Sequence, residues 1–355
     1  MVIIIVMVVS CAVLVGISYF MLDILSGMVV APRTPVEEVA GEGELVLPLA
    51  GGGVASLQVS GDGRFVAYLQ EGEGGADDSL NVCELSDGCS LAFSQAVKGE
   101  HIAWLGSGAS LLYEDAGDIF LLDVEAGTRR NLTASAELDM EPLPSPDGRR
   151  VLWTRAPVGG AAGKPEFWVM DADGSGKAPL AERQDLAAWD PAGEKVISRF
   201  RSYPTTLEDT PAYYLQIAVP GGGGWNYYTE CEGEVSFIWW PREDEILYLS
   251  PLSMRGEDTV RGVWFRVEEP GSLKKVASTD GLGVEEAFYR FYPSREGERM
   301  AYVGERGLEY LDYGDRVVRR LTGVEARTPL AWNEAGGEIF YCRPDGIYRV
   351  AVGGD

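Results

Sequence analysis

The chain contains a single histidine, His101, and this residue limits the chemistry that the sequence supports. A metal site built from several imidazole ligands is excluded, because such a site needs more than one histidine. A Ser-His-Asp triad would have to use His101 as its base. The alternative is a structural role for His101, since it directly precedes the apolar segment 102–105.

Basic residues and a tyrosine gather in three segments that resemble long connections between strands, at residues 155–165, 199–212 and 250–262. Long loops on a rigid scaffold are common places for binding sites. On a chain with a formal charge of −25, this local basic content favours a site for an acidic partner. The alternative is a solvated loop face, because acidic residues lie in the same segments. The candidate partner-binding residues are Arg155, Lys164, Arg199, Arg201, Tyr203, Arg255 and Arg261.

Cys83 and Cys89 flank Ser86-Asp87-Gly88, a triplet of residue types that favour tight turns. Cysteines that face each other across such a turn can form a disulfide, and a disulfide would place the folded part outside the cytoplasm. Two free thiols packed within strands are the alternative. Cys231 and Cys342 have no evident partner in the sequence.

Other motifs point to no cofactor. Residues 171–176 have a superficial likeness to a calcium loop, but strand-like sequence surrounds them where an EF-hand needs helices. No glycine-rich phosphate loop opens a helix, and no nucleophile elbow is evident. We therefore expect no metal and no cofactor, and we assign no catalytic residue.

A sequence pattern that recurs seven times predicts the strands that would position these residues. It consists of an apolar strand, a turn, and a second strand with a characteristic residue five positions after the turn. The turn positions are Gly63, Gly108, Gly148, Gly193, Glu243, Gly297 and Gly336. Five positions later stand Tyr68, Tyr113, Trp153, Ser198, Tyr248, Tyr302 and Tyr341, of which six are aromatic. Recurrence of all-β units every 40–55 residues or so predicts an all-β, seven-bladed propeller of four-stranded blades.

Each unit divides into four strands, and His101 falls in the innermost strand of the second unit. It is therefore a candidate channel-lining residue. The seventh unit ends after its third strand, 347–352, and a blade without its outer strand would leave a long exposed edge. We predict that residues 44–49 pair beside 347–352 and close the ring, so that the propeller spans residues 44–355.

The third unit carries two runs with a recognisable pattern, Pro144-Ser145-Pro146-Asp147-Gly148 and Trp168-Val169-Met170-Asp171-Ala172-Asp173-Gly174-Ser175. These runs resemble the repeat of the TolB-type, WD-like bacterial propellers, and Arg130–Thr133 and Arg319–Thr322 resemble the end of that repeat. As a pattern the resemblance covers about residues 44–352. It implies a propeller fold but no particular function, because the family spans many roles.

Residues 2–22 carry no charge and are numerous enough for a transmembrane helix. A cleaved signal peptide would have a basic start and a shorter apolar core. We therefore predict an uncleaved anchor over residues 1–30 and a linker over 31–43, with a lipoprotein cleavage box at Cys11 as the weaker alternative. The prediction is a single-pass cell-membrane protein with its propeller outside the cytoplasm.

The charge of −25 makes nucleic acid an unfavourable partner, because phosphates repel such a surface, and it favours a monomeric propeller. The sequence favours a non-catalytic binding or scaffold module for an envelope protein or a surface glycan. The alternative is an enzyme that uses the propeller channel, such as a glycosidase or lyase. That enzyme would need two acidic groups at a suitable spacing.

Overall fold

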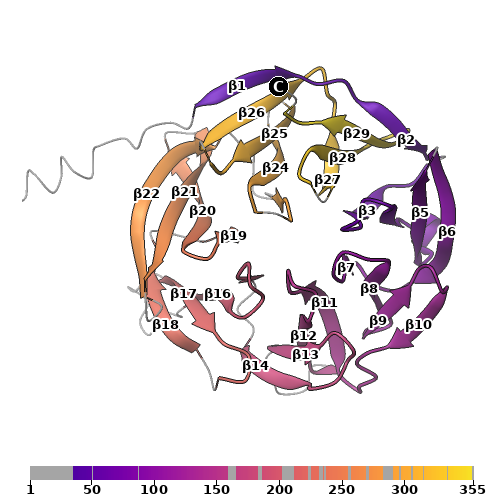
Figure 1. The fold of residues 1–355 in the computed structure, drawn as a ribbon, viewed down its shortest axis with the longest axis horizontal. Coiled ribbons are helices and arrows are strands. Elements are labelled where there is room, and N and C mark those ends of the chain that lie inside the picture. Colours follow the sequence, from indigo (N-terminus) through magenta and orange to yellow (C-terminus); the bar gives the residue numbers. More distant parts are fainter. Residues whose placement is uncertain are drawn as a thin grey trace, which may run out of the picture. The chain divides into compact units, whose positions relative to one another are not determined.

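The structure is a computed structural model. It describes residues 35–353 except 50, 87, 159–164, 183–185, 202–211, 223–224, 232–234, 236, 255–256, 269–271, 283–290, 296, 305–306, 315 and 334. Seven sheets surround a common axis (Figure 1), which confirms the predicted all-β, seven-bladed propeller. The predicted anchor over 1–30 lies outside the described residues. Within them, no helix has the length and apolar character needed to cross a membrane.

The strands of each blade follow one another outward from the axis (Figure 1). Blade one comprises β3 (Val54–Val59), β4 (Phe65–Gln70), β5 (Asp78–Ser86) and β6 (Gly88–Val97), with the short helix η1 (Glu73–Gly75) between β4 and β5. Blade two comprises β7 (Ile102–Trp104), β8 (Ser110–Asp115), β9 (Asp118–Asp123) and β10 (Thr128–Asn131). Blade three comprises β11 (Leu138–Pro144), β12 (Arg150–Ala156), β13 (Glu166–Asp171) and β14 (Ala178–Glu182).

The other four blades repeat this plan. Blade four comprises β15 (Ala187–Trp189), β16 (Val196–Arg201), β17 (Tyr213–Ala218) and β18 (Trp225–Glu230). Blade five comprises β19 (Phe237–Arg242), β20 (Glu245–Met254), β21 (Glu257–Glu268) and β22 (Ser272–Leu282). Blade six comprises β23 (Tyr292–Pro293), β24 (Arg299–Gly304), β25 (Gly307–Asp312) and β26 (Val317–Thr322), with β1 (Val36–Ala40) added outside. Blade seven comprises β27 (Arg327–Trp332), β28 (Glu338–Arg343), β29 (Gly346–Ala351) and β2 (Glu44–Pro48).

The repeated turn has the geometry that its residue types favour. In blade three Ser145 Oγ donates to Asp147 Oδ1 at 2.6 Å, and the amide of Gly148 donates to the carbonyl of Ser145 at 2.9 Å. Gly148 has φ of +69°, a conformation that a side chain would strain. In blade two the left-handed residue is Gly106, not Gly108, although the turn is closed between Leu105 and Ser110, the positions equivalent to Ser145 and Arg150.

Among the described residues the core forms seven apolar clusters, one at each seam between neighbouring blades. The aromatic residue five positions after each turn lies in these seams. Trp153 is fully buried between blades two and three, and Tyr341 is buried between blades six and seven. Ser198, the exception to the aromatic pattern, is also fully buried. Each blade therefore depends on both neighbours for the burial of its apolar side chains.

The N-terminal part of the propeller joins blades six and seven. β2 pairs antiparallel with β29, which is the ring closure that the sequence predicted. The predicted linker 31–43 needs correction, because residues 36–40 form β1 and pair parallel with β26. We call residues 36–48 the strap (Figure 1). At Gly43 a Cβ atom would lie 2.0 Å from Tyr341 Oη, so the strap passes close over the seam.

The acidic residues of the strap explain why a linker-like sequence forms a strand. Glu37 and Glu38 lie 3.3 and 3.5 Å from the guanidinium groups of Arg319 and Arg320 in β26. Val39 packs against the apolar cluster of blades six and seven. Opposite charge on the neighbouring strand thus stabilises a segment whose own composition suggested solvent exposure.

Candidate functional site

The propeller has two faces that differ in the connections they carry. The turns between the first and second strands of each blade lie on one face, which we call the turn face. The connections between blades, and those between second and third strands, lie on the opposite face, which we call the connection face. This follows from the antiparallel order of strands in every blade.

An arginine crosses the ring on the turn face. Arg295 follows the first strand of blade six, yet it donates to the carbonyl of Gly106 in blade two at 2.7 Å and to that of Pro146 in blade three at 3.5 Å. A Cβ atom at Gly61 of blade one would lie 2.0 Å from Arg295 Nη1. The guanidinium therefore spans the axis and contacts turns from three blades on the other side. The sequence carried no signal for this contact.

His101 lies on the connection face, directly before β7. Its Nδ1 is 3.1 Å from Oε1 of Glu114, and its side chain is 49% exposed while that of Glu114 is 9% exposed. Glu114 also accepts the backbone amides of Glu100, at 3.2 Å, and of Glu141. Glu141 in turn accepts the hydroxyl of Thr154 at 2.7 Å. The structure thus places His101 in an acidic group at the seam of blades two and three.

The acidic neighbours of His101 favour its protonated form. The hydrogen bond to Glu114 raises the pKa of His101, with the charges of Glu114, Glu141 and Glu100 adding to that effect and burial opposing it. Nδ1 is the donor to Glu114, so Nε2 is the atom left to exchange protons with solvent. A carboxylate-held histidine of this kind is able to act as a general acid or base.

Arg155, a predicted partner-binding residue, is occupied within the fold. Its guanidinium donates to both oxygens of Asp139, at 2.7 and 3.0 Å, and lies 4.3 Å from the ring centroid of Trp168. Asp139 is fully buried and also accepts the indole N–H of Trp153 at 2.7 Å. Removal of Arg155 would leave a buried carboxylate without its counter-charge, so this arginine stabilises blade three.

The other predicted partner-binding residues are spread over blades three to five. Arg199, in β16, donates to the carbonyl of Val235 at 2.6 Å and lies 5.6 Å from the ring centroid of Tyr213. Arg201 ends β16 and Arg261 lies in β21. Lys164, Tyr203 and Arg255 lie outside the described residues. The structure therefore does not bring these residues together into one described cluster.

The expected connection at 250–262 is mostly strand. β20 and β21 pair from Glu245 with Arg266 to Met254 with Glu257, so the hairpin extends well past the other blades. The β-branched residues Thr259 and Val260 favour this extended pairing. At the expected connections 155–165 and 199–212, strand structure likewise continues to Ala156 and Arg201.

A cavity of about 490 Å³ opens on the connection face of blade seven. It is lined by Glu325, Ala326, Arg327, Arg343, Pro344 and Asp345. Strand pairing explains the juxtaposition, because Arg327 in β27 pairs with Cys342, the residue before Arg343. Arg343 lies 4.0 Å from a Glu325 oxygen and 3.9 Å from an Asp345 oxygen, both on exposed side chains. No pattern in the sequence indicates this site, because its two arginines lie 16 positions apart (343 − 327).

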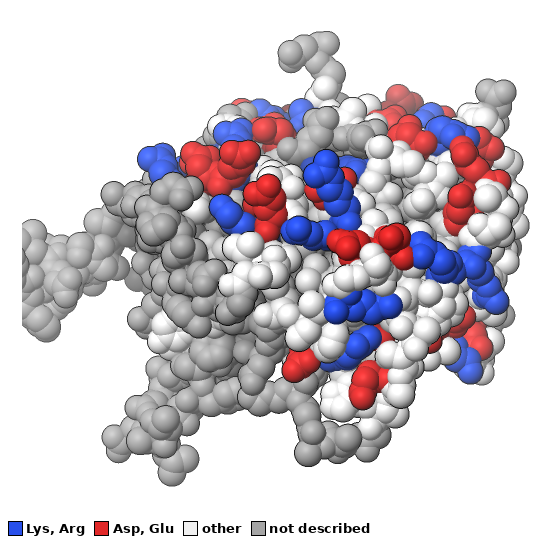
Figure 2. Space-filling model, turned by 60° about the horizontal axis from the view of Figure 1, so that its bottom comes forward, with Lys and Arg blue, Asp and Glu red and all other residues white. Residues whose placement is uncertain are grey.

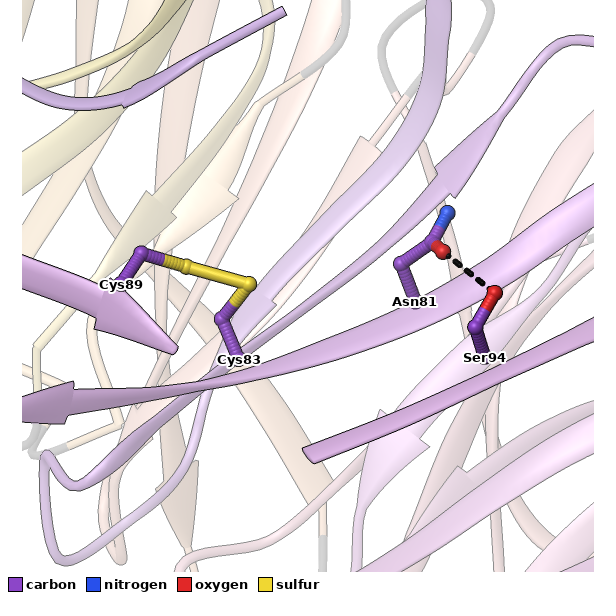
Figure 3. Close-up of a disulfide and its surroundings, with 4 residues drawn as sticks. All are labelled: Asn81, Cys83, Cys89 and Ser94. Atoms are coloured by element: carbon purple, nitrogen blue, oxygen red, sulfur yellow. Dashed lines mark hydrogen bonds between the residues drawn. A yellow bond between two sulfur atoms is a disulfide. The ribbon is translucent and has the colours of Figure 1, made fainter. Parts of the chain in front are cut away.

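Cys83 and Cys89 form a disulfide across the β5–β6 hairpin (Figure 3). Beside it, the hydroxyl of Ser94 in β6 donates to the amide oxygen of Asn81 in β5 at 2.8 Å (Figure 3). Cys83 belongs to the apolar cluster of blades seven and one, and Cys89 packs against that cluster. The disulfide therefore ties the outer hairpin of blade one at the seam where the ring closes.

Surface charge does not separate into large patches on the face that Figure 2 shows. Basic and acidic side chains lie intermixed there, despite the net charge of −25. In the described part of the chain, no group of three or more His, Cys, Asp or Glu residues is arranged to hold a metal ion.

The comparisons with known proteins identify the fold. No protein-family model and no curated protein sequence matches the chain. Among solved structures, hydrazine synthase of Kuenenia stuttgartiensis is similar at a TM-score of 0.59 and 12% identity, over 87% of this chain and 98% of that one. An oligogalacturonate lyase in complex with manganese is similar at 0.58 and 11%, over 92% and 99%.

TolB from Acinetobacter baumannii also matches, at a TM-score of 0.45 and 18% identity, over 73% of this chain and 63% of that one. The predicted resemblance to β-propellers is confirmed at the level of the fold by the seven sheets and by the similarity to the oligogalacturonate lyase. Identities this low carry no function from these proteins to the chain.

Proposed function

We propose that the chain is a membrane-anchored propeller, displayed outside the cytoplasm, that binds an envelope protein or a surface glycan without catalysing a reaction. The observation that carries the proposal is the open cavity between Arg327 and Arg343 on the connection face. The ion pairs of Arg343 with Glu325 and Asp345 are long and solvent-exposed, and such pairs contribute little to stability. A carboxylate of a ligand is able to replace them.

The chemistry of the cavity favours an acidic group in the ligand. Two arginines beside an open cavity suit bidentate hydrogen bonds to the carboxylate of an acidic glycan or of an acidic peptide segment. The neighbouring carboxylates of Glu325 and Asp345 disfavour highly charged polyanions, which agrees with the expectation that nucleic acid is an unfavourable partner. Arg201 in blade four and Arg261 in blade five stay predicted partner-binding residues apart from this cavity, whereas Arg155 and Arg199 make contacts that support the fold.

The disulfide supports the proposed location. Disulfides persist in oxidising compartments and are rare in the cytosol, so Cys83–Cys89 favours a propeller that lies outside the cytoplasm. The uncharged segment 2–22 supplies the proposed anchor.

The test measures binding of uronate-containing oligosaccharides and of acidic peptides to the full-length protein in detergent. The variant is Arg327→Glu/Arg343→Glu, and the matched control is Arg149→Glu, an 85% exposed arginine on the turn face. We expect the double variant to lose binding and the control to retain it. Equal binding by both variants would remove the cavity from consideration.

A second candidate function rests on His101 and its acidic neighbours. A carboxylate-held histidine at a propeller seam is compatible with a glycosidase or lyase that uses Glu114 or Glu141. Incubation with acidic polysaccharides distinguishes the two functions. Release of shortened or unsaturated products, abolished in His101→Gln, would favour the enzyme, whereas intact polysaccharide would favour the binding module.

A further inference from the structure

The outer strand of blade one differs from every other outer strand of the propeller. β6 reads Gly-Cys-Ser-Leu-Ala-Phe-Ser-Gln-Ala-Val and contains neither a charged residue nor a proline over its ten positions. Each other outer strand contains at least one. The relevant residues are Glu37 and Glu38 in β1, Glu44 and Pro48 in β2, Arg129 and Arg130 in β10, Pro179 and Glu182 in β14, Glu230 in β18, and Lys274, Lys275 and Asp280 in β22.

Charge and proline on an outer strand protect its unpaired backbone groups from other strands. A sheet edge with neither device presents a row of open N–H and C=O groups that an extended chain is able to pair with. On a chain with 55 acidic and 30 basic residues, an uncharged run of ten at an exposed edge stands out.

β6 is both exposed and rigidly held. The order of strands places it at the edge of its sheet, and Leu91 is 62% exposed, the highest value among the exposed large apolar residues of the described chain. On its inner side β6 pairs with β5 along its whole length. The Cys83–Cys89 disulfide and the Ser94–Asn81 hydrogen bond fix this hairpin (Figure 3). A partner strand would therefore meet an edge that is already ordered, which lowers the entropy cost of binding.

Blade six provides a precedent within the same molecule. Its four strands β23–β26 form a complete blade, and β1 adds to the outside of β26 as a fifth strand. The two strands carry opposite charges, since Glu37 and Glu38 of β1 face Arg319 and Arg320 of β26. A blade of this propeller thus accepts an added strand whose side chains complement its edge.

We propose that β6 is a docking edge at which an extended, uncharged segment of another protein adds as the fifth strand of blade one. In blade six the added strand carries charges opposite to those of the strand that it joins. Because β6 carries no charge, we expect the segment that adds to it to be uncharged as well. A second copy of this chain is disfavoured by repulsion between two molecules of charge −25. This surface lies on the rim of the propeller, and the proposal does not depend on the cavity of blade seven.

The experiment uses the full-length protein in detergent and a labelled, end-capped decapeptide of alternating threonine and valine as the probe. A second peptide with glutamate in place of alternate threonines tests the charge requirement. Fluorescence anisotropy measures binding, and hydrogen exchange locates the protected amides. The variant is Leu91→Lys, and the control is Thr128→Lys at an exposed position of β10, an outer strand that already carries charge.

We expect the uncharged peptide to bind and to slow exchange within residues 88–97. Leu91→Lys should weaken its binding about tenfold, which corresponds to about 1.4 kcal/mol, while Thr128→Lys binds as the wild type does. The acidic peptide should bind more weakly than the uncharged one. If Leu91→Lys fails to fold, Ser90→Lys at a neighbouring exposed position replaces it.

Three results would overturn the proposal. The first is no binding of the uncharged peptide, and the second is binding that Leu91→Lys leaves unchanged or that protects residues outside 88–97. The third is a wild-type dimer that protects residues 88–97 and becomes monomeric in Leu91→Lys, which would assign the edge to a second copy of the chain.

Discussion

At the scale of single residues, the buried carboxylate of Asp139 organises blade three. It accepts the indole of Trp153 and the guanidinium of Arg155, and its Oδ2 atom also accepts the hydroxyl of Ser135 at 2.7 Å. Each of these donors offsets part of the cost of removing the charge from water. Trp153 therefore contributes both apolar burial and a hydrogen bond at the seam of blades two and three.

We expect Trp153→Ala to lower the free energy of unfolding by about 3–5 kcal/mol, because it leaves a cavity in the seam and removes a donor to Asp139. Urea unfolding of the purified protein measures the loss. Val158→Ala is the control, since Val158 lies just after β12 in the same blade and is 51% exposed. A loss below about 1 kcal/mol for Trp153→Ala would contradict its place in the core.

His101 gives a prediction about pH. Because the pKa of His101 is raised in the folded protein, its stabilising contribution is complete below the ordinary value of 6.5 and disappears as the pH rises through the folded pKa. The stability difference between wild type and His101→Gln should therefore be larger at pH of about 6 than at about 8.5. Thermal unfolding of both proteins across this range measures it.

The control for the pH prediction is Lys98→Gln, a 66% exposed position near His101. Its stability relative to wild type should be the same at the two pH values, since its ion pair with Asp77 is long, at 4.0 Å, and exposed, and such pairs contribute little to stability. A pH-independent difference for His101→Gln would show that Glu114 does not hold the imidazolium.

At the scale of elements, the strap combines two strands of unequal importance. β1 adds to a blade that is already complete, whereas β2 supplies the outer strand that blade seven lacks. The two strands should therefore differ in what their removal does to the ring.

A chain that starts at Glu44 loses β1, and we expect it to be less stable by about 1–2 kcal/mol, from a partly buried valine and exposed ion pairs. A chain that starts at Gly51 also loses β2 and should be destabilised several-fold more, because the edge of β29 is exposed. Thermal unfolding compares both with a chain that starts at Pro35. Equal losses for the two truncations would contradict the role of β2 in closure.

Elements were predictable where a local signal sets them. The turn glycines and the following aromatic residues locate the strands of most blades, and Pro-Asp-Gly after Ser145 specifies its own turn. β1 was missed because its stability comes from Arg319 and Arg320, almost 300 positions away. Arg295 was missed for the same reason, since its contact with Gly106 joins residues 189 positions apart that ring geometry brings together. The cavity was missed because it depends on the pairing of Arg327 with Cys342 within blade seven, which no local signal indicates.

At the scale of the whole molecule, the interleaved charges in Figure 2 and the net charge of −25 favour a dispersed protein. We expect a chain that starts at Pro35 to fold and to remain monomeric without detergent. Sedimentation at several concentrations measures this. Self-association that persists in Leu91→Lys would show that a surface other than β6 is responsible.

The strap also has a consequence for the order of events during synthesis. Glu44 and Arg349 form an ion pair at 2.9 Å although 305 positions separate them. At bacterial-like rates of 5–20 residues per second, the first partner waits roughly 15–60 s for the second. Throughout that time the apolar Leu45-Val46-Leu47 has no blade to join. The nascent chain therefore cannot close its ring until its last strand is made, and a chaperone that shields residues 44–48 would cover an apolar segment of the propeller for nearly the whole of its synthesis.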